Sequence, residues 1–252
     1  MNFMTAIVLI TAGFLGGLAN ALAGGASLFT FPALLASGLS PITANASNAF
    51  ALLPANAMAA WVDGEKLPSR TSVTVGTFIC AMLGGIIGGI LLIVTPARFF
   101  QLLVPALIGL ATAMFIFGKT LQRALGWLLG TGAHPKLCAV LIFFSGIYGG
   151  YFGAGLGVVM MAVLGATTVW EMRMTNAYKN VLNVGANVAA NVLFVSFNMI
   201  SWRETLVMIL GTAAGGYAGG RLVKILPVNA VRLTICFSGV IMTAIYVNRY
   251  WL

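Results

Sequence analysis

The sequence predicts an all-α polytopic membrane protein made of two inverted-topology repeats, each a broken-helix hairpin plus three transmembrane helices. Three observations lead to this prediction: the composition, an internal repeat, and the distribution of basic residues between the apolar segments. Of the 252 residues, 60% are hydrophobic and only 7% are charged, whereas soluble domains carry about 25% charged residues. Apolar runs of about 20 residues, the length that a helix needs to cross a bilayer, recur along the whole chain. The first run has no Lys or Arg before it, so we expect mature protein and not a cleaved signal peptide.

An internal duplication appears when the chain is aligned with itself at an offset of 131 residues. Without a gap, 17 of 91 aligned pairs are identical. The identities fall in clusters. For example, Gly84–Gly89 aligns with Gly215–Gly220, and Asn56 aligns with Asn187. The sequence therefore predicts a first transmembrane repeat over 1–118, a cytoplasmic connecting loop over 119–136 and a second transmembrane repeat over 137–252.

The first repeat contains four predicted elements. Its opening apolar stretch is broken at Gly24 and Gly25, and Ser40 and Pro41 supply an N-cap and a first-turn proline for the next helix. A Thr-Pro pair opens the last span in the same way. The predicted elements are 3–37 with its break, 41–62, 72–94 and 96–117.

The second repeat follows the same order. Its first stretch is broken at 153–157. Thr168 with Glu171, and Ser201 with Glu204, have the spacing of a capping box and predict helix starts. The predicted elements are 137–167 with its break, 172–197, 202–225 and 227–247.

The length of the stretch 3–37 decides the predicted topology. A single helix of that length would be about 50 Å long, far beyond a hydrocarbon core of about 30 Å, so the stretch must turn back. If it enters and leaves on one side, ten of the 13 basic residues lie on one face and only Arg98, Arg203 and Arg249 on the other. A single crossing would divide them almost evenly. The positive-inside rule favours the first arrangement, with 119–136 in the cytoplasm and both termini in the periplasm.

Each repeat then crosses the membrane an odd number of times, so the two copies run in opposite directions. Both arms of each hairpin could cross, or the hairpin could be re-entrant, and the sequence leaves this open. Inverted repeats with glycine-interrupted segments at matching positions point to a secondary transporter with a central site. Two copies of a purely structural bundle are the alternative.

Candidate binding residues lie at the breaks and on the helix that follows each break. A helix break at membrane depth is tolerated only where the freed backbone groups face protein or water, and the N-terminus of a half-helix suits an anion. Amides that recur along one helix face in an apolar span must be hydrogen-bonded or wet. The predicted substrate-binding residues are Gly24, Gly25, Ser27, Asn45, Ser47, Asn48, Gly153, Gly155, Asn176, Lys179, Asn180 and Asn183.

Each of these residue types also has a structural interpretation. Glycines let membrane helices approach closely, and this is the favoured interpretation of Gly84–Gly89 and Gly215–Gly220. Asparagines can join helices instead of lining a passage, and we expect this of about half of them. Lys179 could extend its ammonium group to the interface or act as a fixed cation beside an anion path.

Other functional classes find little support in the sequence. The three cysteines lie singly in apolar segments and are predicted to be small core residues. No His lies within a predicted span to act as a base for Ser27, and no HExxH motif is present, so we expect neither an enzyme nor a bound cofactor or metal. The four acidic residues lie at loops or helix starts, which argues against a carboxylate proton relay. The predicted partners are a small anion and the lipid bilayer, with no nucleic acid and with a homo-oligomer left open.

Three segments resemble a known family. The segment "ALAGGASLFTFPALLASGLSPITANASN" (21–48) resembles the first signature of the TauE/SafE sulfite exporter family, "GIYGGYFGAGLG" (146–157) its second, and "TNAYKNVLN" (175–183) the helix after it. The resemblance covers nearly the whole chain. It implies an inner-membrane permease that moves sulfite, sulfonates or related sulfur-containing anions, often outward. A passive anion channel and a non-transporting membrane scaffold are the alternatives.

The chain departs from the family pattern in two respects. Some members carry an acidic residue shortly before the first glycine cluster, where this chain has Asn20. The family is commonly described with seven or eight spans, whereas two hairpins with fully crossing arms would give ten.

Overall fold

The computed structural model describes residues 2–62, 67–129, 132–222 and 228–252, and all regular secondary structure in this part is α-helical. The first repeat contains α1 (Phe3–Ala23), α2 (Ser27–Ala36), α3 (Pro41–Ala51), α4 (Leu53–Val62), α5 (Ser72–Val94) and α6 (Ala97–Leu129). The second contains α7 (Pro135–Tyr151), α8 (Leu156–Thr167), α9 (Met172–Ser196), α10 (Trp202–Leu222) and α11 (Val228–Tyr250).

Several of these helices fit a polytopic membrane protein. Within the described residues, three helical segments are long and apolar enough to cross a membrane: Phe3–Ala21, Ser72–Val94 and Ala97–Gly118. The short arms α2 and α8 have 10 and 12 residues. At 1.5 Å per residue they are about 15 and about 18 Å long, roughly half of a hydrocarbon core. Neither short arm is therefore long enough by itself to cross the full hydrocarbon core.

The two predicted breaks are confirmed, and glycine makes both of them. Gly24 ends α1 in the left-handed region, with φ of 77°, and its N–H group bonds the carbonyls of Ala19 and Asn20. Gly153 and Gly155 stand between α7 and α8 with φ of 76° and 78°. Only glycine adopts this conformation without steric cost, which is why the helices stop at these positions.

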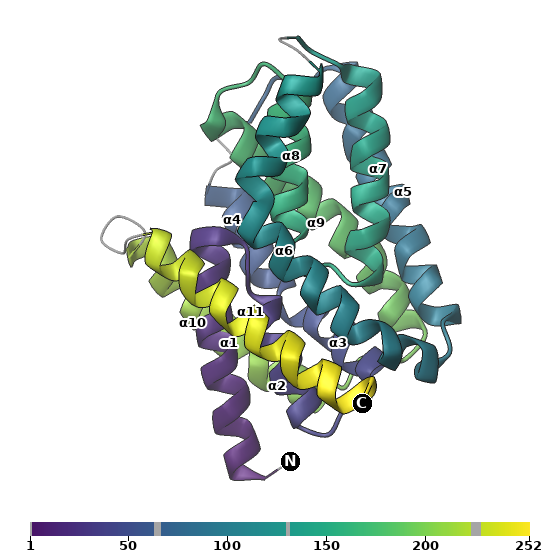
Figure 1. The fold of residues 1–252 in the computed structure, drawn as a ribbon, viewed down its shortest axis with the longest axis vertical. Coiled ribbons are helices and arrows are strands. Elements are labelled where there is room, and N and C mark those ends of the chain that lie inside the picture. Colours follow the sequence, from purple (N-terminus) through teal and green to yellow (C-terminus); the bar gives the residue numbers. More distant parts are fainter. Residues whose placement is uncertain (1, 63–66, 130–131, 223–227) are drawn as a thin grey trace.

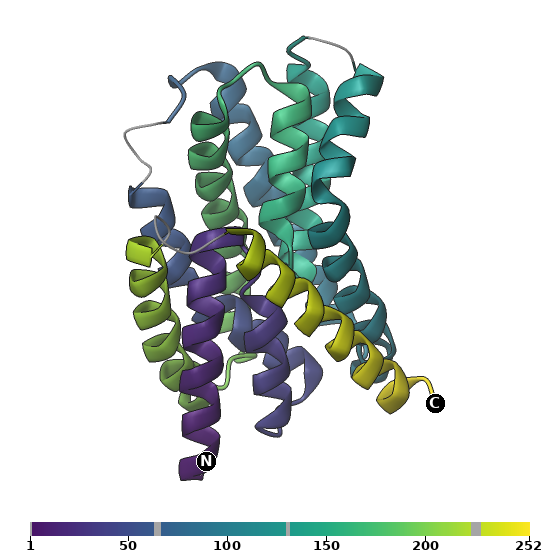
Figure 2. The same cartoon turned by 60° about the vertical axis from the view of Figure 1, so that its left-hand side comes forward.

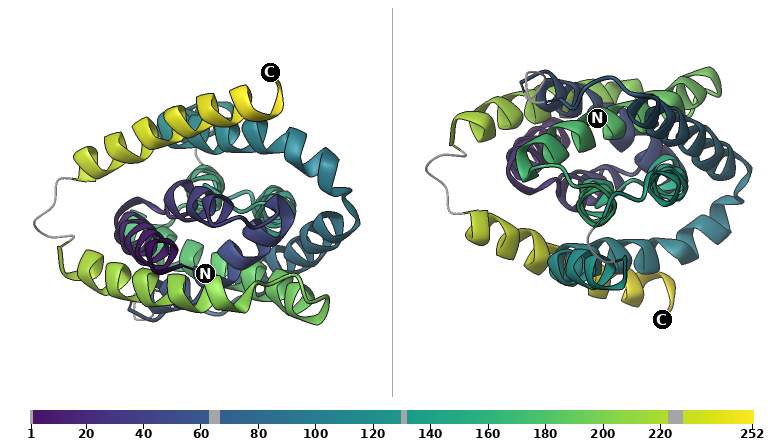
Figure 3. Two further views of the ribbon diagram at one scale, coloured as in Figure 1. Left: turned by 90° about the horizontal axis from the view of Figure 1, so that it is seen from below. Right: turned by 90° about the horizontal axis from the view of Figure 1, so that it is seen from above.

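The two hairpins enter the molecule from opposite ends. Helix α1 rises from the lower end in Figure 1, whereas α7 descends from the upper end, and each chain turns back near the middle. Both termini lie toward the lower end, as Figure 2 also shows, and the segment 132–134 lies at the upper end. Seen along the long axis, the hairpins occupy the interior while α5, α6, α10 and α11 lie around them (Figure 3).

Helices of one repeat pack mainly against helices of the other. Helix α1 lies along α10, and α5 lies along α7 (Figure 1). A Cβ atom added at Gly215 would lie 2.0 Å from the carbonyl oxygen of Phe14, and one at Gly88 would lie 2.1 Å from that of Ile147. The glycine clusters thus serve close helix packing, as the sequence predicts.

Two predicted boundaries are wrong. The helix expected over 41–62 is interrupted at Leu52, because Pro54 lacks an N–H group and its ring clashes with the carbonyl four residues earlier. The connecting loop expected over 119–136 is helical as far as Leu129, since α6 continues beyond its apolar part. The added segment carries leucines at helical spacing, and no proline interrupts it.

The predicted helix starts have mixed outcomes. Ser40 caps α3, accepting a hydrogen bond from the Thr43 N–H group at 3.2 Å. Thr168 instead ends α8, with its hydroxyl on the carbonyl of Leu164, so Glu171 is the residue that precedes α9. The residues between 222 and 228, where one predicted span ends and the next begins, lie outside the described part.

Candidate functional site

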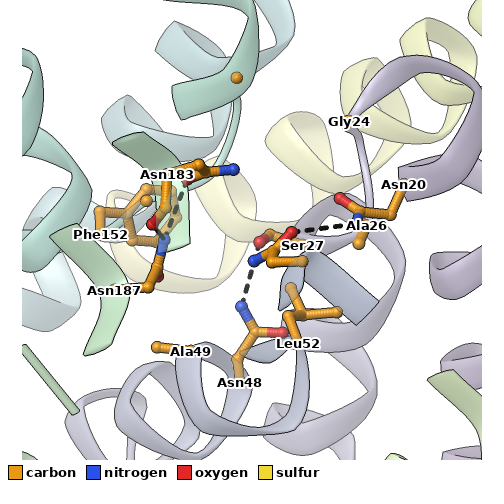
Figure 4. A pocket seen from close by; sticks show the side chains of 13 residues that line it. Asn20, Gly24, Ala26, Ser27, Asn48, Ala49, Leu52, Phe152, Asn183 and Asn187 are labelled. Carbon is orange, nitrogen blue, oxygen red and sulfur yellow. Dashed lines mark hydrogen bonds between the residues drawn. The ribbon is translucent and has the colours of Figure 1, made fainter. Parts of the chain in front are cut away.

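A small cavity lies where the two helix breaks face each other. The unfilled space at this point, including the part open to solvent, is about 400 Å³. Its walls come from both breaks and from α1, α3, α4 and α9 (Figure 4). The lining residues are Asn20, Gly24, Ala26, Ser27, Asn48, Ala49, Leu52, Asn56, Phe152, Gly153, Gly157, Asn183 and Asn187. We call this space the central pocket.

The central pocket brings together part of the predicted site. The predicted residues that line it are Gly24, Ser27, Asn48, Gly153 and Asn183. The predicted residues that do not line it are Gly25, Asn45, Ser47, Gly155, Asn176, Lys179 and Asn180. Lining residues from the two breaks, such as Gly24 and Gly153, are about 130 positions apart in the chain and meet in this pocket.

A chain of three side chains forms the first-repeat wall. The Thr30 hydroxyl donates to Asn48 Oδ1 at 2.5 Å, and Asn48 Nδ2 donates to Ser27 Oγ at 3.1 Å. Thr30 is fully buried and Asn48 is 2% exposed. The amide of Asn48 is thereby held in one orientation, with its nitrogen toward the start of α2 (Figure 4).

Two further amide pairs line the pocket. Asn187 Nδ2 donates to Asn183 Oδ1 at 2.9 Å and to the Asn183 carbonyl at 2.7 Å. Figure 4 shows the amide nitrogen of Asn183 directed into the open space, away from Asn187. Across the pocket, Asn20 Nδ2 donates to Asn56 Oδ1 at 3.0 Å.

Lys179 lies just behind the pocket wall. Its ammonium group donates to Asn176 Oδ1 at 2.8 Å, and a Cβ atom added at Gly157 would lie 3.9 Å from its Cδ. The stem of Lys179 therefore runs past a residue that lines the pocket, while its head is directed back along α9.

Two predicted site residues link helices to one another and do not line the pocket. Asn45 Nδ2 donates to the Tyr151 carbonyl at 2.9 Å, which ties α3 to the end of α7. Ser47 accepts from the Ser201 N–H group at 2.9 Å and ties α3 to the start of α10. These contacts agree with the interpretation of some polar residues as interhelical links.

The remaining glycines and Asn180 lie beside the pocket. Gly25 packs against Ile235, since an added Cβ would lie 2.8 Å from Ile235 Cγ2. Gly155 precedes α8, with Ala111 of α6 next to it. Asn180 is half-buried on α9, next to Lys179 in the chain.

The sequence-based list misses three residues that line the pocket and one, Thr30, that lies behind them, although a signal could have found each. Asn56 and Asn187 occupy the same position in the two repeats, so the 131-residue offset marks them. Asn20 is the polar residue nearest before the first break. Thr30 is the only hydroxyl in an otherwise apolar run after Ser27.

The chemistry of the central pocket is that of neutral hydrogen bonding. None of its described lining side chains carries a charge, and the polar ones are five amides and one hydroxyl. The first turns of α2 and α8 begin at the pocket, but several of their first N–H groups already bond carbonyls of the breaks, among them Leu28 to Gly25 and Leu156 to Gly153. Such a site can bind and release an oxygen-rich solute through amide and hydroxyl donors.

Comparisons with known proteins relate the chain to membrane transporters. A probable membrane transporter protein of Haemophilus influenzae is 26% identical over 243 residues, covering 94% of this chain and 92% of the relative. The probable membrane transporter protein YfcA of Escherichia coli K12 is 25% identical over 243 residues, with 94% and 87% covered. The probable membrane transporter protein ORF9 of a Sinorhizobium species is 25% identical over 218 residues, with 84% and 81% covered. No solved structure matches the chain significantly.

A family model described as Sulfite exporter TauE/SafE matches residues 9–247. The match contains both helix breaks and every residue that lines the central pocket. The chain is thus related to membrane transporters over nearly its full length, and it belongs to the Sulfite exporter TauE/SafE family.

Proposed function

We propose that the protein is an inner-membrane permease that exports small sulfur-containing anions, with sulfite and sulfonates as the substrate class. The observation that carries the proposal is the central pocket, in which two helix breaks from opposite ends of the molecule meet polar side chains of α3, α4 and α9. The family description names sulfite export, and the relatives named above are described as membrane transporters.

The arrangement of the helices supports two inverted halves around this site. At the 131-residue offset, α1 corresponds to α7 and α5 corresponds to α10. The contacts of α1 with α10 and of α7 with α5 are therefore equivalent, and they exchange partners between the repeats. Corresponding helices α1 and α7 enter from opposite ends (Figure 1). Transporters built in this way bind their substrate between the repeats, where broken helices meet.

The orientation that we propose places both termini in the periplasm and the segment 119–136 in the cytoplasm. Both termini lie toward one end of the molecule and 132–134 at the other, which supports opposite faces for them (Figure 2). The excess of Lys and Arg in the segments assigned to the cytoplasm supports the same orientation.

Recognition of the anion would combine neutral donors with one nearby cation. Amide and hydroxyl groups replace part of the hydration shell, and the uncharged lining avoids holding the anion too tightly to release it. We propose that Lys179, beside Gly157, provides the positive charge that favours an anion over a neutral solute. The lack of a carboxylate among the described lining residues agrees with an anionic substrate.

Sulfite release from vesicles tests this function. Purified protein is reconstituted, the vesicles are loaded with ³⁵S-labelled sulfite, and efflux and counterflow are measured. Lys179→Ala should slow efflux sharply, whereas Arg173→Ala, which removes the same charge from the exposed start of α9, should leave it unchanged. Equal loss in both variants would remove Lys179 from the site.

The same vesicles separate the alternatives. A carrier shows accelerated exchange when unlabelled sulfite is present on the far side, whereas a passive channel shows none. Vesicles that contain a scaffold without transport activity would release label no faster than labelled vesicles without protein do. Either result would overturn the proposed function.

A further inference from the structure

We propose that Thr30, which does not line the central pocket, positions the Ser27 hydroxyl through Asn48, so that Ser27 donates its hydrogen to the bound anion. The inference rests on the proposed function, because it deepens the description of the same anion site. It assigns a positioning role to Thr30 and a donor role to the hydroxyl of Ser27.

The direction of the hydrogen bonds follows from the donors available. Asn48 Oδ1 can only accept, so the single hydrogen of the Thr30 hydroxyl lies between these two oxygens, which are 2.5 Å apart. The alternative acceptor, the Ala26 carbonyl, is farther away at 3.0 Å. With its oxygen engaged, the Asn48 amide presents its nitrogen to Ser27, at 3.1 Å.

The consequence falls on Ser27. Its oxygen already accepts from Asn48, so its own hydrogen points elsewhere, and among the described residues no hydrogen bond uses that hydrogen. Ser27 is the first residue of α2, and it lines the pocket. Thr30 thus decides whether the pocket receives a hydroxyl donor or loses it to Asn48.

The second repeat shows that the chain of hydrogen bonds from Thr30 through Asn48 to Ser27, which we call the relay, is not a general requirement of the fold. The positions that correspond to Ser27, Thr30 and Asn48 at the 131-residue offset are Val158, Met161 and Lys179. A cation therefore stands in the second repeat where a neutral relay stands in the first. The two sides of the pocket therefore differ: a hydroxyl lines one side, and Lys179 lies behind the wall on the other.

Thr30→Val is the sharpest test because valine keeps the shape and removes only the hydroxyl. The methyl group of Thr30 packs on Gly16, and valine retains it. Without the Thr30 donor, the Asn48 amide is free to turn and accept the hydrogen of Ser27. Because this removes a hydrogen bond to a charged group, we expect the KM for sulfite efflux to rise about tenfold with Vmax nearly unchanged.

Three further variants separate positioning from packing. Thr30→Ser keeps the hydroxyl and should restore a KM near that of the unmodified protein. Thr205→Val is the matched control, because Thr205 is also fully buried and, among the described residues, its hydroxyl bonds only the Ser201 carbonyl at the start of its own helix. Ser27→Ala removes the donor itself, so adding Thr30→Val to it should raise the KM no further.

These outcomes decide the inference. Equal effects of Thr30→Val and Thr205→Val would overturn it, as would additive effects of Thr30→Val and Ser27→Ala. A KM for Thr30→Ser as high as that for Thr30→Val would also contradict it, since the hydroxyl would then be irrelevant.

Thermal unfolding with added anions keeps this test independent of export. Sulfite, sulfate and methanesulfonate are added to the detergent-solubilised protein, with methylammonium as a cationic control, because a ligand that binds the folded state raises its Tm. The relay predicts that at least one oxyanion raises the Tm, and that Thr30→Val needs about tenfold more of it. Binding without vesicle transport would refute the proposed export and keep the relay. No shift with any oxyanion would refute the relay.

Discussion

Glycine at position 24, in the first helix break, is required by the sign of its φ angle and not by lack of space. A Cβ atom added at Gly24 would meet nothing within 4 Å, and the same is true of Gly76 near the start of α5. The two positions differ in backbone conformation, because Gly24 has φ of 77° whereas Gly76 is an ordinary helical residue. Gly24 and Gly76 are therefore matched in open space and differ in backbone conformation, so that alanine at each of them isolates the effect of φ.

Alanine should have opposite effects at these two positions. Gly24→Ala forces an L-residue into the left-handed region and should lower the free energy of unfolding by about 1–2 kcal/mol. Gly76→Ala improves helix propensity and should raise it by about 0.5–1 kcal/mol. Denaturant unfolding followed by circular dichroism in detergent measures both. If both variants were stabilised, the break at Gly24 would not depend on glycine.

Two asparagines one turn apart on α9 should respond differently to leucine. Asn187 holds the Asn183 amide at the pocket, so Asn187→Leu should raise the KM for sulfite about fivefold to tenfold. Asn191 does not line the pocket, and its buried Oδ1 has no partner among the described residues. Asn191→Leu should therefore leave the KM unchanged and the Tm equal or higher, because it removes an unpaired polar atom. If the KM rose in both variants, the effect would come from a general disturbance of α9 and not from the loss of the Asn187 contact at the pocket.

The sequence predicts which types of residue form the site better than it predicts which individual residues reach the pocket. Helix spacing places Asn176, Asn183 and Asn187 on related faces of one helix, but it does not say which of them reaches a cavity. That choice depends on which side of α9 meets the opposite break, a tertiary contact between segments far apart in the chain. Asn45 illustrates the limit, because it binds the Tyr151 carbonyl instead of lining the pocket.

At the scale of helices, close packing of glycine against a facing backbone fixes α1 on α10 and α5 on α7. Gly215 and Gly216 are neighbours in α10 that test this contact. A Cβ atom at Gly215 would lie 2.0 Å from a backbone oxygen, whereas one at Gly216 would meet only the Ala55 Cβ at 3.7 Å. Gly215→Ala should cost about 3 kcal/mol or more, and Gly216→Ala should be tolerated. The Tm and the yield of monodisperse protein in detergent measure the difference, and equal Tm values would argue against the contact.

Helix bounds follow from the sequence where local signals act alone. The limits of α5, 72–94, are those that its apolar run predicts, and the breaks at Gly24 and Gly153 occur where glycine interrupts a span. The prediction fails at Leu52, because Pro54 interrupts the helix without interrupting the apolar run, and beyond Phe117, where an amphipathic continuation of α6 resembles a polar loop. Hydropathy detects the membrane-spanning part of a helix and not its full length.

At the scale of the whole molecule, the inverted arrangement predicts where the ends of the chain lie. A cysteine at position 2 and Ala133→Cys, both in a background without the native cysteines, should react with a membrane-impermeant maleimide from opposite faces. Ala133 is exposed in the segment between α6 and α7, so accessibility does not limit its labelling. Labelling of both sites in intact cells would contradict the inverted topology.

The most direct test of the central claim, that the central pocket is the anion site, is protection of a cysteine placed in its wall. Ala49→Cys lines the pocket, and Ala133→Cys lies outside it as a control, again without the native cysteines. An anion that the vesicles transport and that does not react with thiols, such as methanesulfonate, should slow alkylation at position 49 at concentrations near its KM and leave position 133 unaffected. Alkylation at position 49 that proceeds at the same rate with saturating transported anion would place the site elsewhere.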